Sequence, residues 1–133
     1  MSKVYVVQDP MIMRDGRKER RFSLAPAEEY GELVFLLGWN DTRGLGVKPG
    51  AERRLYRTLR YNLREFNDSD YLLMTGNWTA MAMAVVCALE HTRGFVSCLQ
   101  WDQEDREYRV IAIDVNLDDD DENWTPELEN EDE

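Results

Sequence analysis

YLLMTGNWTAMAMAVVCALEHTRGFVSCLQW, residues 71–101, is the stretch that decides the fold. It opens with a short apolar run at 71–74 and, after a polar turn, continues into an Ala- and Met-rich segment at 78–91 that is long enough for a helix. A second apolar run follows at 95–101. Two short strands separated by a helix of this length predict a right-handed unit with parallel strands. The helix is apolar around nearly its full circumference, which predicts burial on more than one side.

The segment before this stretch shows the same alternation. Residues 33–37 (LVFLL) form a continuous apolar run, which is typical of a buried strand. A loop at 38–50, rich in Gly, separates this strand from residues 51–66, where apolar side chains recur at helical spacing. These side chains are Leu55, Leu59, Leu63 and Phe66. The order strand, helix, strand, helix, strand predicts a small α/β domain with a central parallel βαβαβ unit and two main helices.

Further strands are predicted before this unit. Residues 4–7 are β-branched or aromatic and predict a short strand. Asp15-Gly16 is a hairpin-turn signal, and the runs 11–13 and 22–24 on either side of it are its expected arms. The sheet is therefore expected to be mixed, with antiparallel edges.

The C-terminal part of the chain combines a predicted hairpin with an acidic tail. Residues 95–101 and 108–115 flank a charged turn, which predicts an antiparallel hairpin. Residues 114–133 hold eleven Asp and Glu and no Lys or Arg, and the net charge of the whole chain is −11. The rest of the chain is therefore neutral on balance. We expect a globular α/β domain at 1–115 and a disordered acidic tail at 116–133.

Composition excludes several classes of protein. A hydrophobic fraction of 43% and four Trp in 133 residues indicate a packed core. Cys87 and Cys98 lie within apolar runs and predict neither a disulfide framework nor a zinc site. The sequence shows no run typical of a secretory leader or of a membrane span, so we expect a protein of a reducing compartment.

Two predicted strand-to-helix loops are candidate ligand-binding sites. At the carboxyl ends of parallel strands, helix N-termini expose free N–H groups that bind phosphates. The candidates are Gly44, Gly46 and Lys48 in the first loop, and Thr75, Gly76, Asn77 and Thr79 in the second. Neither spacing matches a dinucleotide fingerprint or a P-loop. The simpler interpretation is a connecting loop and a helix cap supplied by Asn77 or Thr79.

The helix predicted at 51–66 carries a cationic row. Arg53, Arg57, Arg60 and Arg64 recur along one side of this helix. Such a row can bind phosphates or an acidic protein surface. The acidic tail can engage a basic partner or fold back on this row, and Trp124 is its candidate apolar anchor for such a contact. A tail that only solvates the chain is the simpler interpretation of those charges. A solvated helix face is the simpler interpretation. Nucleic acid is not an expected partner, because the body of the chain is neutral on balance.

No catalytic or metal-binding constellation is visible in the sequence. His91 is the only histidine, and it follows Cys87 by one helical turn without a recognisable nucleophile motif. A buried Cys and a His near a helix C-terminus explain both residues. One His and two separated Cys do not make a metal site. We therefore expect a non-enzymatic protein without a cofactor or a metal.

Three stretches resemble small accessory proteins of tailed bacteriophages. They are residues 29–37 (EYGELVFLL), 70–77 (DYLLMTGN) and 99–102 (LQWD), the last lying before Tyr108. The resemblance covers residues 4–113 and not the acidic tail. It implies expression in the cytoplasm of an infected host and a role in host takeover or in countering host defences. It carries over no catalytic residues.

Three functions stay open from the sequence. The first is a protein that binds a host or phage protein through the cationic row, with the acidic tail extending or modulating the contact. The second is a small nucleotide-binding or nucleotide-sequestering protein that uses the two candidate loops. The third is a virion or assembly protein. A homo-oligomer formed through Trp39 and the arm at residues 11–13 would favour this function. No association with a membrane is expected.

Overall fold

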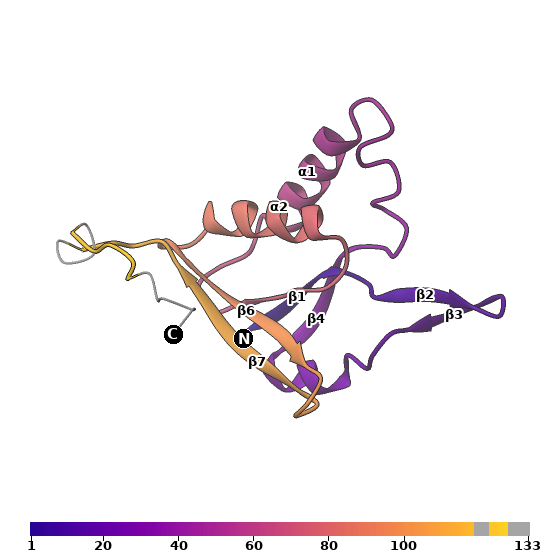
Figure 1. The fold of residues 1–133 in the computed structure, drawn as a ribbon, viewed down its shortest axis with the longest axis horizontal. Helices are drawn as coiled ribbons and strands as arrows, with labels where there is room; N and C mark the ends of the chain where they lie inside the picture. Colours follow the sequence, from indigo (N-terminus) through magenta and orange to yellow (C-terminus); the bar gives the residue numbers. More distant parts are fainter. Residues whose placement is uncertain (119–122, 128–133) are drawn as a thin grey trace.

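The computed structural model describes residues 1–118 and 123–127, in which two α-helices, one 3-10 helix and seven strands follow one another (Figure 1). Their bounds are β1 (Lys3–Gln8), β2 (Met11–Arg14), β3 (Arg17–Arg20), η1 (Ala25–Tyr30), β4 (Glu32–Leu37), α1 (Ala51–Asn62), β5 (Tyr71–Leu73), α2 (Trp78–Leu89), β6 (Phe95–Asp102) and β7 (Glu107–Asp114). Five of the strands form one mixed sheet, and β2 and β3 form a separate hairpin. The predicted α/β fold class is confirmed.

The main sheet has the strand order β4-β1-β5-β6-β7. β1 pairs in parallel with β4 and with β5, and β5 pairs in parallel with β6. β7 pairs with β6 in antiparallel register, with Phe95 opposite Asp114 and Asp102 opposite Glu107. The parallel βαβαβ unit and the antiparallel C-terminal hairpin that the sequence predicts are therefore both present.

The sheet is covered on both faces. α1 and α2 pack side by side on one face, where Leu59, Leu72 and Val96 belong to the larger hydrophobic cluster (Figure 1). η1 lies on the other face, where Leu24 and Ala27 pack in a second, smaller cluster. The domain thus has three layers. None of the helices in the described part of the chain has the length and apolarity that crossing a bilayer requires.

α1 ends earlier than the sequence predicts. The spacing of its apolar residues correctly predicts its buried face, because Leu55 and Leu59 both lie in the core. The helix stops at Asn62 instead of continuing to 66, since the backbone leaves helical geometry at Leu63 (φ −101°, ψ 10°). Asn62 Nδ2 donates to the carbonyl oxygen of Leu36 at 2.9 Å, which fastens this end of the helix to β4. Leu63 and Phe66 stay buried in the turn that follows.

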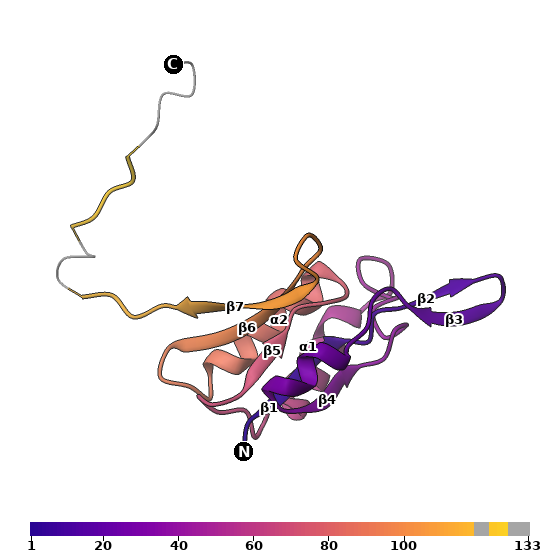
Figure 2. The same cartoon turned by 90° about the horizontal axis from the view of Figure 1, so that it is seen from below.

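The second arm of the N-terminal hairpin is β3, not the predicted run at 22–24. Asp15 (φ 51°) and Gly16 (φ 76°) form a two-residue turn, so pairing resumes directly at Arg17 and ends at Arg20. Phe22 packs against the body instead and stacks on Trp101, with the ring centroids 6.0 Å apart. The hairpin projects from one end of the molecule, and the chain leaves β7 at the other end (Figure 2).

Candidate functional site

The loops after β1, β4 and β5 meet at the carboxyl edge of the sheet, where Gln8 connects them. Gln8 is the last residue of β1 and only 4% of its surface is exposed. Its Nε2 donates to the carbonyl oxygens of Gly38 and Trp39, both at 3.2 Å. Its Oε1 accepts from the backbone N–H of Asn77 at 2.8 Å. One buried amide therefore holds both candidate ligand loops against β1.

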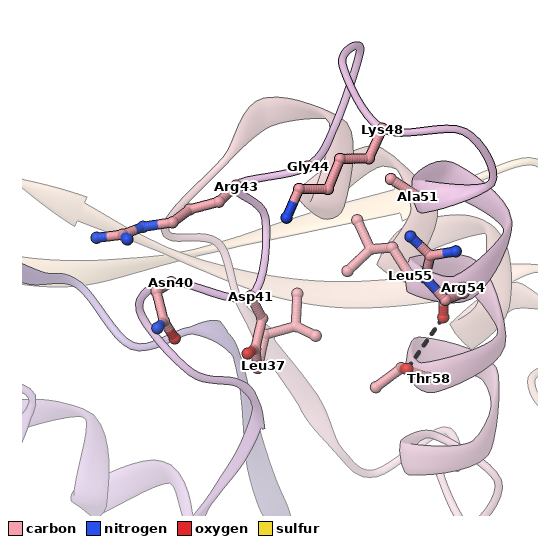
Figure 3. Close-up of a pocket in the computed structure, with 10 residues that line it drawn as sticks. All are labelled: Leu37, Asn40, Asp41, Arg43, Gly44, Lys48, Ala51, Arg54, Leu55 and Thr58. Carbon is pink, nitrogen blue, oxygen red and sulfur yellow. Dashed lines mark hydrogen bonds between the residues drawn. The ribbon is translucent and has the colours of Figure 1, made fainter.

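The first candidate loop borders a hollow of about 480 Å³ beside the N-terminal half of α1 (Figure 3). Gly44 and Lys48 line this hollow, and Lys48 reaches across it, whereas Arg43 points away. The N–H of Gly46 donates to Glu52 Oε2 at 2.6 Å and is therefore not free for a ligand. The same hydrogen bond is the main cause that lowers the pKa of Glu52 below its usual value.

The second candidate loop leads into α2, and Asn77 caps this helix as the simpler interpretation predicted. Asn77 Oδ1 accepts from the N–H groups of Thr79 at 2.8 Å and Ala80 at 3.2 Å. Gly76 (φ 101°) lies so close to Gln8 that a Cβ at this position would be 2.4 Å from Gln8 Cβ. The backbone donors of this loop are thus largely used inside the protein, and Gly76 is needed for close packing.

The candidate ligand residues do not line one common cavity. Gly44 and Lys48 belong to the hollow beside α1, whereas Gly76, Asn77 and Thr79 border a shallow depression at the start of α2. Thr75 borders a third cavity, at the end of β1. A phosphate site requires its donors to converge on one point, so the two loops do not assemble into a single phosphate cradle.

The cationic row lies entirely at the surface and borders two grooves, and its last member, Arg64, lies in the turn after α1 because the helix ends at Asn62. Arg53, Arg57, Arg60 and Arg64 are all exposed. Arg57 and Arg60 line both grooves; Met83 of α2 lines the first of them, and His91 lines the second. The row is thus next to α2 and not on an isolated face of α1.

Glu90 joins the two helices at this boundary. The hydroxyl of Tyr56 donates to Glu90 Oε1 at 2.9 Å, and Arg60 Nε lies 3.4 Å from Glu90 Oε2. The hydrogen bond to the carboxylate is the main cause that raises the pKa of Tyr56. Arg60 is therefore partly neutralised, whereas Arg53 and Arg57 have no ion-pair partner among the described residues.

α2 has an uncovered apolar side that the sequence did not reveal. The helix has no charged residue from Trp78 to Leu89, and four of its small residues are buried against the sheet and α1: Ala80, Ala84, Cys87 and Ala88. On the outer side Trp78 is 85% exposed and Val86 is 52% exposed, and Ala82 lies between them at a spacing of one helical turn. We call Trp78, Ala82 and Val86 the apolar stripe of α2.

β7 is an edge strand with exposed apolar side chains. Among the described residues it pairs only with β6, and Val110 and Ile111 are 50% and 40% exposed. An edge strand presents unpaired backbone groups with which another chain can pair. This edge is a second surface that suits contact with a protein.

Only the beginning of the predicted tail and residues 123–127 are described. Val115 and Asn116 still contact the body, since the N–H of Val115 donates to Gly94 O at 2.8 Å and Asn116 Nδ2 donates to Arg93 O at 2.9 Å. Trp124 is 68% exposed. The prediction that the tail is disordered falls mainly on 119–122 and 128–133, which lie outside the described residues.

The residues with potential for nucleophilic chemistry are not brought together. Cys87 and Cys98 are free and buried, and burial raises the pKa of both thiols, that of Cys98 to about 11. Both are thus protonated thiols near neutral pH. His91 lies at the surface beside the cationic row. No group of His, Cys, Asp and Glu suited to a metal ion occurs within the described ranges.

Comparison with known protein families gives a match that covers most of the chain. The family model described as Phage Pam3 gp32-like protein matches residues 2–115, which include all the helices and strands described above. The acidic segment from 116 onward lies outside the match. No match was found among curated proteins or among solved structures.

Proposed function

The chain belongs to the family of phage Pam3 gp32-like proteins, and we propose that it acts by binding another protein and not by catalysis. The observation that carries this proposal is the apolar stripe of α2. A helix at a protein surface normally has polar or charged residues on its solvent side. α2 has no charged residue there, its one exposed polar residue is Thr79 in the first turn, and it exposes a tryptophan, a residue type that is enriched at the energetic centres of interfaces.

The surroundings of the stripe indicate the chemistry of the partner. Val86 precedes Glu90 by one helical turn, and Glu90 contacts Tyr56 and Arg60 of α1. The apolar stripe therefore borders the cationic row along the contact between the two helices. A complementary protein surface is apolar at its centre and acidic along one side, because opposite charges steer association and determine orientation.

The membership in a phage family supports a partner present in the infected cell. We place the contact in the host cytoplasm, where the partner is a host or phage protein. Binding of a host protein would serve host takeover or the countering of a host defence. A partner of the virion would instead make the chain an assembly factor, and the identity of the captured protein distinguishes these roles.

The test compares two substitutions that add the same charge at exposed valines. Val86→Glu introduces a carboxylate into the apolar stripe, whereas Val47→Glu does so in the loop after β4, where Val47 is 80% exposed. Tagged wild type and both variants are captured from infected cells, and the bound proteins are quantified by mass spectrometry. We expect the amount of partner captured by Val86→Glu to be lower than that captured by the wild type by about tenfold or more, since burying an unpaired charge in an interface opposes binding. Val47→Glu should retain it.

The cationic row is tested in the same assay. Arg57→Gln should weaken capture and reduce its dependence on salt, because exposed charge attraction is screened over about 10 Å at 0.1 M salt. Circular dichroism and thermal unfolding establish that each variant is folded. Equal capture of the same proteins by the wild type, Val86→Glu and Arg57→Gln would contradict the proposal.

A further inference from the structure

The sheet contains a topological switch point between β1 and β5 that the surfaces proposed for protein binding do not use. From β1 the chain crosses to β4 on one side, and from β4 it returns through α1 to β5 on the other side. The loops that follow β1 and β5 therefore diverge. In open α/β sheets, ligands bind in the crevice that such a divergence creates at the carboxyl ends of the strands.

A cavity of about 220 Å³ lies at this point. Its wall comes from four separate segments, represented by Gln8 at the end of β1, Phe22 after the hairpin, Trp39 after β4 and Thr75 after β5. Pockets for drug-sized molecules begin at about 300 Å³, so this cavity suits a ligand with one ring system and a small substituent.

The base of the cavity is held in place before any ligand binds. Gln8 is buried and hydrogen-bonded to the loops after β4 and β5, with Gly38, Trp39 and Asn77 as its backbone partners. Gly76 packs directly against the Gln8 side chain. A site with fixed walls loses little conformational entropy on binding, which favours affinity for a small ligand.

Two polar groups in the wall have no partner within the protein. Thr75 is only 7% exposed, and its hydroxyl forms no hydrogen bond with any residue of the described ranges. Arg21, an exposed residue, also lines the cavity, and its guanidinium makes no ion pair with any residue of the described ranges. The nearby Asp9 does not neutralise Arg21, because both oxygens of Asp9 accept from Arg20, at 3.1 and 3.4 Å. A hydroxyl that is free to donate and a cation without an ion pair together favour a ligand with an acidic group.

The rim of the cavity is cationic as well. Lys18 of β3 and Arg43 of the loop after β4 lie over the ring of Trp39, at 5.3 and 5.1 Å from its centroid. Residues 14–21 contain five bases and two acids, an excess of positive charge. Trp39 therefore combines an aromatic wall with a positive environment, in which an anion is attracted.

We propose that this cavity binds a small anion that contains one planar ring system, a chemistry shared by nucleoside monophosphates and aromatic carboxylates. The ring packs against Phe22 and Trp39, the acidic group faces Arg21, and the Thr75 hydroxyl hydrogen-bonds to the ligand. Of the residues in the two candidate ligand loops, Thr75 and Gly76 line this cavity. The ligand would therefore lie at the end of β1.

The test uses the full chain labelled with ¹⁵N and follows the backbone amide signals of Trp39, Thr75 and Gly76. The ligands are AMP, GMP, CMP and UMP as nucleotides, benzoate as an aromatic carboxylate, and inorganic phosphate as an anion without a ring. At least one ring-containing anion should shift these signals in a saturable way. It should bind about tenfold more tightly than inorganic phosphate, a difference that one stacked ring can supply.

Two substitutions and a matched control complete the test. Thr75→Val keeps the shape of the side chain and removes the hydroxyl, and Arg21→Gln removes the cation; each should weaken binding by about tenfold. Arg17→Gln changes an exposed cation of the same hairpin outside the cavity and should leave the affinity unchanged. The absence of saturable shifts with every ligand, or equal losses from Arg17→Gln and Arg21→Gln, would overturn the proposal. Val86→Glu should bind the ligand normally, which separates this site from the protein contact.

Discussion

The substitution Gln8→Leu should reduce the free energy of unfolding by about 3 kcal/mol, although Leu and Gln have similar sizes. The change leaves the N–H of Asn77 and the carbonyl oxygens of Gly38 and Trp39 without the amide that satisfies them. A buried polar group without a partner costs about 1–3 kcal/mol. The carbonyl oxygen of Gly38 keeps the N–H of Asp41 as a donor, at 3.2 Å, and Gly38 is exposed to water. We therefore assign about 2 kcal/mol to the N–H and about 1 kcal/mol to the two carbonyl groups together.

Urea unfolding measures this loss, with circular dichroism and tryptophan fluorescence as independent probes. Coincident transitions and an unchanged slope with urea concentration would show that the comparison concerns stability and not a different unfolded state. Gln100→Leu is the matched control, because Gln100 is exposed on β6. Its effect should stay within about 0.5 kcal/mol, as is usual for surface substitutions.

Hydrogen exchange locates the effect within the fold. Gln8→Leu should increase exchange of the Asn77 amide far more than exchange of amides at the centre of β6, because Asn77 loses its acceptor directly. A loss of less than about 1 kcal/mol, or an Asn77 amide that stays protected, would refute the role assigned to Gln8.

Other predictions concern the thiols and the edge strand. Burial raises the pKa of the Cys98 thiol from 9.0 to about 11. The contribution of the protonated thiol to stability is therefore complete below pH 9 and is lost as the pH rises toward 11. Cys98→Ala should make the free energy of unfolding less sensitive to pH in that window, which urea unfolding at several pH values measures. At pH 8 neither Cys87 nor Cys98 should react with an aromatic disulfide reagent until the protein unfolds, and rapid reaction of the folded protein would contradict their burial. Ile111→Lys should remove any concentration-dependent self-association measured by light scattering, since a lysine on an edge strand opposes pairing with another chain.

The regular parts of this fold were predictable because they follow local rules. Continuous apolar runs alternate with helical spacing, which is sufficient to predict a parallel βαβαβ unit and the buried face of α1. Element ends were less predictable, because distant contacts determine them. α1 stops where Asn62 bonds to Leu36, a residue 26 positions earlier in the chain. The Asp15-Gly16 turn was recognised, but the length of its second arm depends on Phe22 packing on Trp101.

The candidate sites were only partly predictable for the same reason. Thr75 and Gly76 were found because a Gly-containing loop before a helix is a local signal. Gln8 was missed, since its partners lie 30 to 69 positions away. A polar residue at the carboxyl end of the first predicted strand was the available signal. The open side of α2 was missed because a helix without amphipathic character does not reveal which of its sides is uncovered.

The position of the tail leads to a final prediction, which concerns the cavity at the end of β1. The tail leaves β7 next to Asp114, which pairs with Phe95 at the amino ends of the parallel strands, whereas the cavity lies at their carboxyl ends. The eight residues of β7 span about 26 Å, so charges that stay beside the end of β7 lie well beyond the distance of about 10 Å over which charges act at 0.1 M salt. Removal of residues 117–133 should therefore change the affinity of the cavity for its anion by less than about twofold at that salt concentration. A marked increase in affinity would instead show that the acidic tail occupies the cationic rim, and that the chain regulates its own ligand site.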